Sequence, residues 1–153
     1  MELFESIIQA LSGYDVAFEI KDRELAVMNR RNGNVLSVFE EVSFSRDRKE
    51  RYVEYTVDFS TQHRHYDPED ADELLDYMRS ILDDRTLPLE FYLEEKPRFG
   101  TEIPSEDLGR LSVSYLQDLF RYFNIDLLPF DFEIHSWSGR YDTGRRRVAD
   151  LKP

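Results

Sequence analysis

Hydrophobic positions recur with two different periods along the chain, and the changes of period divide it into predicted helices and strands. In residues 2–11 the apolar side chains are spaced by three and four residues, which predicts a short amphipathic helix. Residues 15–60 instead alternate between apolar and polar side chains, in short runs separated by turns such as Asn32-Gly33. The clearest run is 51–60. We therefore predict an antiparallel meander of about four strands after the first helix.

A second amphipathic helix is predicted over residues 67–84. Asp67 is suited to cap its N-terminus, and Pro68 suits the first helical position, where no backbone N–H is needed. The apolar side chains form one stripe along this helix, and its opposite face is almost entirely acidic. The acidic face has two interpretations: a surface that is only solvated, or a docking face for a basic partner.

The rest of the chain repeats a helix–strand pattern. We expect a strand at 87–93, a loop over 96–104 with a short strand near 98–103, a helix over 106–123 capped by Ser105, and a strand at 127–134. The two strands match at an offset of 41 residues, either by duplication or by chance. The predicted fold is a single α+β domain spanning 1–153, in the order α-β-β-β-β-α-β-α-β.

The final segment, 136–153, lacks a long apolar pattern and is predicted to be a loosely ordered basic tail. Trp137, Tyr141 and Val148 are its candidates for attachment to the body. We expect the run Arg145-Arg146-Arg147 to fold back onto acidic residues rather than to act as an independent binding tail.

Charge narrows the classes of partner. The 153-residue chain has a net charge of −12, divided as −3 over residues 1–66, −12 over 67–133 and +3 over 134–153. A body of this charge repels phosphates, so we expect no nucleic-acid partner. The chain has no cysteine, and no apolar run approaches the roughly 20 residues that span a bilayer, so we expect a cytoplasmic protein without a membrane partner.

The sequence contains few signals of catalytic chemistry. The segment from His63 to Asp67 resembles a metal site only in spacing, and we interpret His63 and His65 as polar strand-end residues. His135 is predicted to lie on the surface. The acids that alternate with apolar strand residues, Glu133 among them, are predicted to face solvent. Neither a nucleophile motif nor a glycine-rich phosphate loop is present, so we predict no catalytic, cofactor or metal residues.

These observations favour a non-enzymatic acidic protein that binds a more basic protein. Immunity proteins, antitoxin-type inhibitors and acidic secretion chaperones have a similar size and charge, and the order of elements resembles that of class I secretion chaperones, from which the final strand departs. Two alternatives stay open: an enzyme with a carboxylate or histidine site, and a salt-adapted structural or ligand-binding domain. The candidate partner-binding residues are Asp72, Glu73, Asp76, Asp83 and Phe120.

Overall fold

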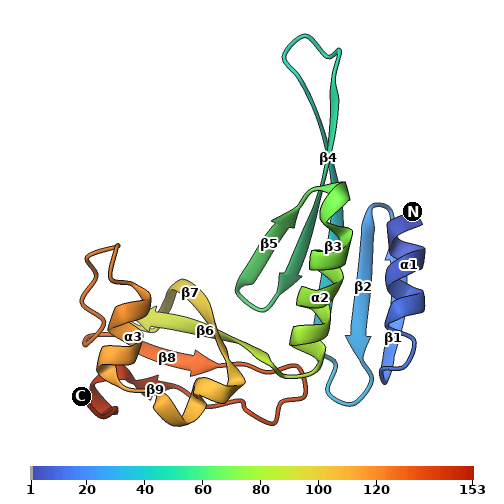
Figure 1. The fold of residues 1–153 in the computed structure, drawn as a ribbon. Coiled ribbons are helices and arrows are strands. Elements are labelled where there is room, and N and C mark those ends of the chain that lie inside the picture. The colour runs from blue at the N-terminus through green and yellow to red at the C-terminus, as the bar shows by residue number, and fades with distance from the viewer. Residues whose placement is uncertain (1) are drawn as a thin grey trace.

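The computed structural model describes residues 2–153 and shows an α+β fold (Figure 1). Within this range the strands form two antiparallel sheets, one in the order β1-β2-β3-β4-β5 and one in the order β7-β6-β8-β9. The first sheet is a simple meander, as the alternating pattern predicts. Its elements are α1 (Glu2–Ala10), β1 (Val16–Lys21), β2 (Glu24–Asn29), β3 (Val35–Phe44), β4 (Arg51–Phe59) and β5 (Gln62–Tyr66).

The second sheet and its helices occupy the rest of the chain. After a 3-10 turn, η1 (Pro68–Asp70), helix α2 leads into this sheet. The elements are α2 (Ala71–Leu82), β6 (Thr86–Leu93), β7 (Lys96–Pro104), η2 (Ser105–Arg110), α3 (Val113–Leu119), β8 (Asp131–Ile134), β9 (Arg146–Arg147) and η3 (Val148–Asp150).

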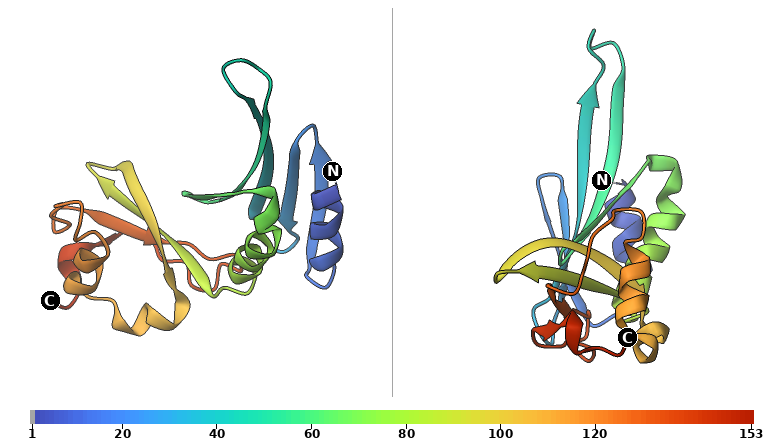
Figure 2. Two further views of the ribbon diagram at one scale, coloured as in Figure 1. Left: turned by 45° about the horizontal axis from the view of Figure 1, so that its top comes forward. Right: turned by 90° about the vertical axis from the view of Figure 1, so that its left-hand side faces the viewer.

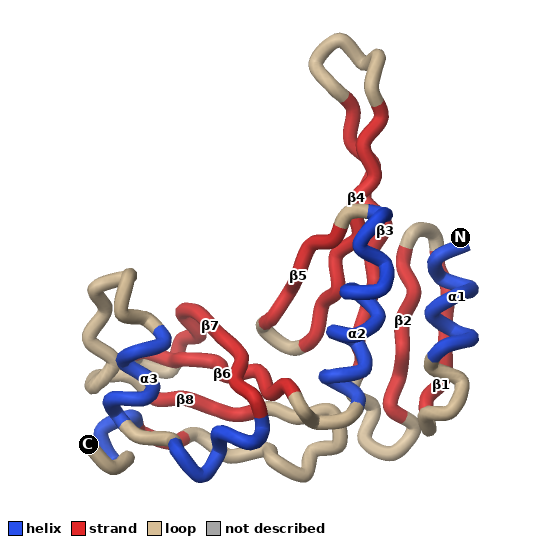
Figure 3. Tube along the Cα trace, viewed as in Figure 1, coloured by secondary structure: helices blue, strands red, loops and turns tan. Residues whose placement is uncertain are grey.

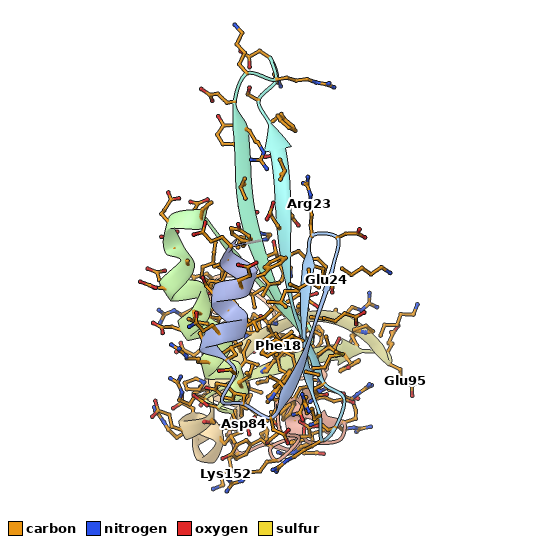
Figure 4. The ribbon with its side chains drawn as sticks, turned by 90° about the vertical axis from the view of Figure 1, so that its right-hand side faces the viewer. Phe18, Arg23, Glu24, Asp84, Glu95 and Lys152 are labelled. Atoms are coloured by element: carbon orange, nitrogen blue, oxygen red, sulfur yellow. The ribbon has the colours of Figure 1, made fainter. Side chains whose placement is uncertain are left out.

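Each sheet has its own hydrophobic core. Helices α1 and α2 cover the same face of the first sheet and bury their apolar stripes against it (Figures 1 and 2). Helix α3 and the C-terminal segment cover one face of the second sheet. On that face alternate residues of β6 and β8 are buried. The β3–β4 hairpin projects well beyond the β1–β2 turn, where Arg23 and Glu24 lie (Figure 4).

Trp137 joins the two parts. The chain leaves β8 of the second sheet and runs back beneath the first sheet before returning to β9 (Figures 1 and 3). There the indole is buried in the first core, edge-on to Phe59 with ring centroids 5.7 Å apart. Its carbonyl oxygen accepts hydrogen bonds from the side-chain amides of Asn29, Asn32 and Asn34, each at 2.9 Å.

The predicted attachment of the final segment is therefore visible in part. Trp137 and Val148 are both buried, and Val148 belongs to the second core. The Nε atom of Arg145 lies 3.1 Å from Oε1 of Glu133, which confirms that the basic run folds back onto an acidic residue.

Three predicted elements are wrong in detail. The strand expected over 127–134 is shorter, since β8 begins only at Asp131. The helix expected over 106–123 is broken: η2 ends at Arg110, and α3 begins only at Val113, where the Ser112 hydroxyl accepts from the backbone N–H of Tyr115 at 3.0 Å. A serine that bonds the backbone in this way starts a helix rather than continuing one. The C-terminal residues also hold this end, since Val113 N–H donates to the carbonyl of Lys152 at 2.7 Å.

The short strand expected near 98–103, within a loop over 96–104, is present but extends over the whole segment as β7. It pairs with β6 through a tight turn in which Glu94 and Glu95 both adopt positive φ, at 52° and 65°. Such turns usually contain glycine or asparagine, so the sequence carries no signal for this hairpin. Pro97 and Pro104 are tolerated because β7 is an edge strand.

The Trp137 anchor gives a stability prediction. Trp137→Ala removes a buried indole that links the two cores, and we expect it to lower the free energy of unfolding by about 3–5 kcal/mol. Urea denaturation followed by circular dichroism measures this loss. The matched control is Tyr122→Ala, because Tyr122 is 84% exposed and its truncation should change the free energy by less than about 0.5 kcal/mol. Equal stabilities for the two variants would contradict the anchoring role.

Candidate functional site

The acidic face predicted on the second helix is present on α2. Leu74, Met78 and Ile81 are fully buried against the first sheet, so the opposite side of the helix faces outward. The helix begins at Ala71, after the turn Pro68–Asp70, and Asp67 makes no side-chain capping bond. The predicted cap is wrong because the proline opens a 3-10 turn instead of the α-helix.

Three of the candidate residues form one surface, which we call the acidic face of α2: Asp72, Glu73 and Asp76. All three are exposed. The side chain of Asp76 is 80% exposed, and its nearest cation is Arg79 at 4.0 Å on the same helix. Within residues 2–153, no ion pair is formed by Asp72 or Glu73. This face therefore carries negative charge that the described part of the fold does not neutralise.

Asp83 is exposed but already has partners. One carboxylate oxygen accepts from the Tyr14 hydroxyl at 2.8 Å, and the other lies 3.5 Å from the Arg85 guanidinium. The neighbouring Asp84, at the end of α2 (Figure 4), accepts from the backbone N–H of Ser138 at 3.0 Å. The acids at this end of α2 tie chain segments together, so we do not include Asp83 in the acidic face.

Phe120 lies in the second core. Its ring is 8% exposed and sits edge-on to Phe91 and Phe99, with centroids 5.3 and 5.1 Å away. It borders an open hollow of about 610 Å³ beside α3, but little of the ring is accessible there. Phe120 is thus a core residue, and we leave it out of the proposed surface, although Tyr122 and Phe123 from the same predicted helix are exposed.

A groove of about 590 Å³ runs beside the acidic face, between α2 and the edge strand β5. Glu73 and Asp76 line it from the helix, and Arg64 lines it from the strand. Arg64 forms an ion pair with Glu102 of β7, and its guanidinium carbon lies 4.1 Å from the centroid of the Tyr77 ring. The Tyr77 hydroxyl donates to the same glutamate at 2.8 Å. Two of the side chains that line the groove, Arg64 and Tyr77, are thus held together by Glu102.

Burial raises the pKa of the Tyr77 phenol to about 12. The nearby Arg64 cation opposes this rise, whereas the neighbouring Tyr66 and Asp58 add to it. The Tyr77 hydroxyl keeps its proton and donates it in the hydrogen bond to the Glu102 carboxylate.

His63 and His65 are exposed residues of β5, as the sequence predicts, whereas His135 differs from its prediction. His65 does not meet Asp67; its Nδ1 lies 2.9 Å from Oε1 of Glu54 and 3.0 Å from the Thr56 hydroxyl. His135 is not a plain surface residue but is half-buried beside Glu90 and Glu133. This second group was missed because its members come from two strands whose pairing the sequence does not reveal.

The site so defined is an acidic helix face beside a groove, on a two-sheet α+β scaffold. Among the described residues, no helix has both the length and the apolar character needed to cross a membrane. Comparisons with protein-family models, curated proteins and solved structures gave no match. The function is therefore argued from the geometry and charge of the site.

The raised pKa of Tyr77 gives a prediction for alkaline pH. Below pH 10 the phenol is protonated in both the folded and the unfolded chain and adds no pH dependence. Between about pH 10 and 12 the unfolded chain loses this proton while the folded chain retains it, so stability falls by about 1.4 kcal/mol per pH unit from this group.

We expect Tyr77→Phe to flatten the loss of stability over this pH window. Urea midpoints measured from pH 8 to 12 test the slope, and Tyr122→Phe is the control at an exposed tyrosine. Identical slopes in the wild type and the Tyr77→Phe variant would show that the phenol is not held protonated.

Proposed function

We propose that this protein binds a basic partner protein through the acidic face of α2, as an inhibitor-like or chaperone-like interaction protein of the cytoplasm. The observation that carries the proposal is the exposure of Asp72, Glu73 and Asp76 on one helix face, where the only ion pair among residues 2–153 joins Asp76 to Arg79 at 4.0 Å. Exposed carboxylates cost little to keep in water and are free to pair with incoming cations.

Long-range charge supports the same proposal. Residues 67–133 have a net charge of −12, equal to that of the whole chain, and the acidic face lies within them. A field of one sign raises the rate at which an oppositely charged partner meets the surface, and the effect weakens as salt is added. Binding of a basic protein should therefore be fast at low salt and sensitive to ionic strength.

The groove beside the helix gives such a partner a place to bury side chains. Affinity in protein complexes comes mainly from a few buried anchors, whereas rim charges contribute to rate and orientation. The groove between α2 and β5 adjoins Glu73 and Asp76, so a partner steered to the acidic face reaches it directly. We place the contact at this junction of helix face and groove.

The test is a charge reversal with a control of matched charge. The triple variant D72K/E73K/D76K reverses the acidic face, and the control D22K/E94K/E95K reverses three exposed acids on tight turns away from it. Each chain is immobilised and used at low and high salt to isolate binding proteins from the source organism.

We expect a protein of high isoelectric point to be retained by the wild type and the control at low salt, and its affinity for the α2 variant to be at least about tenfold weaker. Equal loss of binding in both variants would mean that only overall charge matters. Retention of no basic protein by the wild type at low salt would also overturn the proposal.

A further inference from the structure

A second polar cluster lies on the face of the second sheet that is turned away from its core. Glu90 of β6 and Glu133 of β8 are direct partners in the register of the two strands. Both alternate with buried apolar residues, which places their side chains on the same polar face. His135 follows β8 by one residue and is fixed by a hydrogen bond from its backbone N–H to the Pro88 carbonyl at 3.0 Å.

The three side chains are partly buried, with exposed fractions of 16% for Glu90, 21% for Glu133 and 31% for His135. The Nε2 atom of His135 is itself buried and has no hydrogen-bond partner among residues 2–153. It lies 3.8 Å from Oε2 of Glu90 and 3.6 Å from Oε2 of Glu133. These separations exceed the 2.7–3.2 Å range of N–H···O hydrogen bonds.

Such separations are close to those between ligands of one metal ion. Two ligand atoms that each lie about 2.0–2.2 Å from a tetrahedral ion are about 3.3–3.6 Å apart. The ligand atoms of Glu90, Glu133 and His135 all lie within 4.8 Å of one another. A small inward movement of the side chains brings all three to bonding distance of a shared ion.

The charge of the cluster favours the same conclusion. Like charges directly opposite each other on neighbouring strands are destabilising. Arg145 compensates one carboxylate, since its Nε lies 3.1 Å from Oε1 of Glu133, whereas the oxygens nearest His135 are the two Oε2 atoms. Two glutamates are therefore set against one arginine beside the imidazole of His135, and a divalent cation bound between them would offset the excess of carboxylates.

We propose that Glu90, Glu133 and His135 form a binding site for a divalent transition metal ion, with Zn²⁺ as the preferred ion. Each glutamate supplies Oε2 and the histidine supplies Nε2. A ligand set of one imidazole and two carboxylates suits zinc and leaves a fourth position for water or a substrate atom. Mg²⁺ and Ca²⁺ favour oxygen-only sites, so they should compete poorly.

The neighbouring side chains fit the role of outer-shell partners. The Tyr92 hydroxyl donates to Oε2 of Glu90 at 2.5 Å and reaches Oε2 of Glu133 at 3.3 Å. The Arg145 guanidinium carbon lies 3.5 Å from the centroid of the Tyr92 ring, and this stacks the arginine beside the carboxylate that it pairs with. Contacts of this kind orient metal ligands and strengthen binding. His135 also lines a cavity of about 230 Å³, whose other lining residues belong to the first sheet and to the segment after β8.

The chain contains its own comparison site. Glu41, Glu54 and His65 also bring three ligand atoms together, but Glu41 and His65 are exposed. The ring nitrogen of His65 already has hydrogen-bonding neighbours at 2.9 and 3.0 Å. We therefore assign the metal to the Glu90 cluster, and His65→Gln becomes the matched control.

Calorimetric titration of the purified full chain with Zn²⁺ tests the site. We expect one ion per chain with a dissociation constant in the micromolar range or below, unchanged by excess Mg²⁺. E133Q and H135Q should each weaken binding by at least about tenfold, whereas H65Q should not. Absence of micromolar binding in the wild type, or loss of binding in H65Q with retention in H135Q, would overturn the assignment.

A spectroscopic measurement of zinc binding by the wild-type chain does not depend on the folding of the E133Q and H135Q variants. The protein has three histidines, so a long-range ¹H–¹⁵N spectrum contains three imidazole patterns, assigned with H63Q and H65Q. Zinc should shift the ring nitrogens of His135 and leave those of His63 and His65 in place. A shift confined to His63 or His65 would show that zinc binds elsewhere and refute the proposal.

Discussion

The carbonyl oxygen of Trp137 accepts three side-chain amide hydrogen bonds, from Asn29, Asn32 and Asn34 in the β2–β3 turn. These bonds hold a segment that belongs in sequence to the second sheet against the first sheet, with the indole in the first core. Buried polar groups are costly when unpaired, so the three amides and the carbonyl define one position of this segment. Each sheet has its own core, and this contact is one of the two junctions that hold the sheets together.

A second junction fixes the facing surfaces. Gly100 of β7 lies so close to the β4–β5 turn that a Cβ atom there would come within 2.6 Å of the Gln62 side chain and 2.7 Å of the Thr61 side chain. Two residues along β7, Glu102 forms an ion pair with Arg64 and accepts a hydrogen bond from the Tyr77 hydroxyl. The polar face of the second sheet is therefore turned toward the edge of the first. His135, on this side of the second sheet, therefore borders a cavity that residues of the first sheet also line.

The sequence predicts local structure well where a repeating pattern or a turn residue is present. The meander, the Asn32-Gly33 turn and the amphipathic α2 all follow from such signals, and Gly33 has the positive φ that its turn requires. The β6–β7 hairpin has no such signal, because Glu94 and Glu95 adopt its turn. The break before α3 depends on Ser112 and on the C-terminal carbonyls that meet its first turn, and the latter is a tertiary contact.

The two candidate sites also differ in how far the sequence alone predicts them. The acidic face of α2 is contained in one helix, so helical spacing alone brings Asp72, Glu73 and Asp76 together. Glu90 and His135 come together only because β8 pairs with β6 in one register, and shifting that register by one residue would move Glu133 to the core face. Alternation correctly places Glu133 away from the core, but it does not reveal that Glu90 lies opposite.

Burial then separates the roles of these carboxylates. On α2 the acids stay in water, where repulsion between them is screened and a shared field is tolerated. On the second sheet two carboxylates with 16% and 21% exposure are paired directly across strands, where repulsion is stronger and hydration weaker. A diffuse partner charge is enough to complement the helix face. Arg145 and the Tyr92 hydroxyl compensate the sheet cluster in part, and a cation between the Oε2 atoms and Nε2 would complete that compensation. For this reason we propose an interaction surface for the exposed acids of α2 and a defined cation site for the half-buried acids of the second sheet.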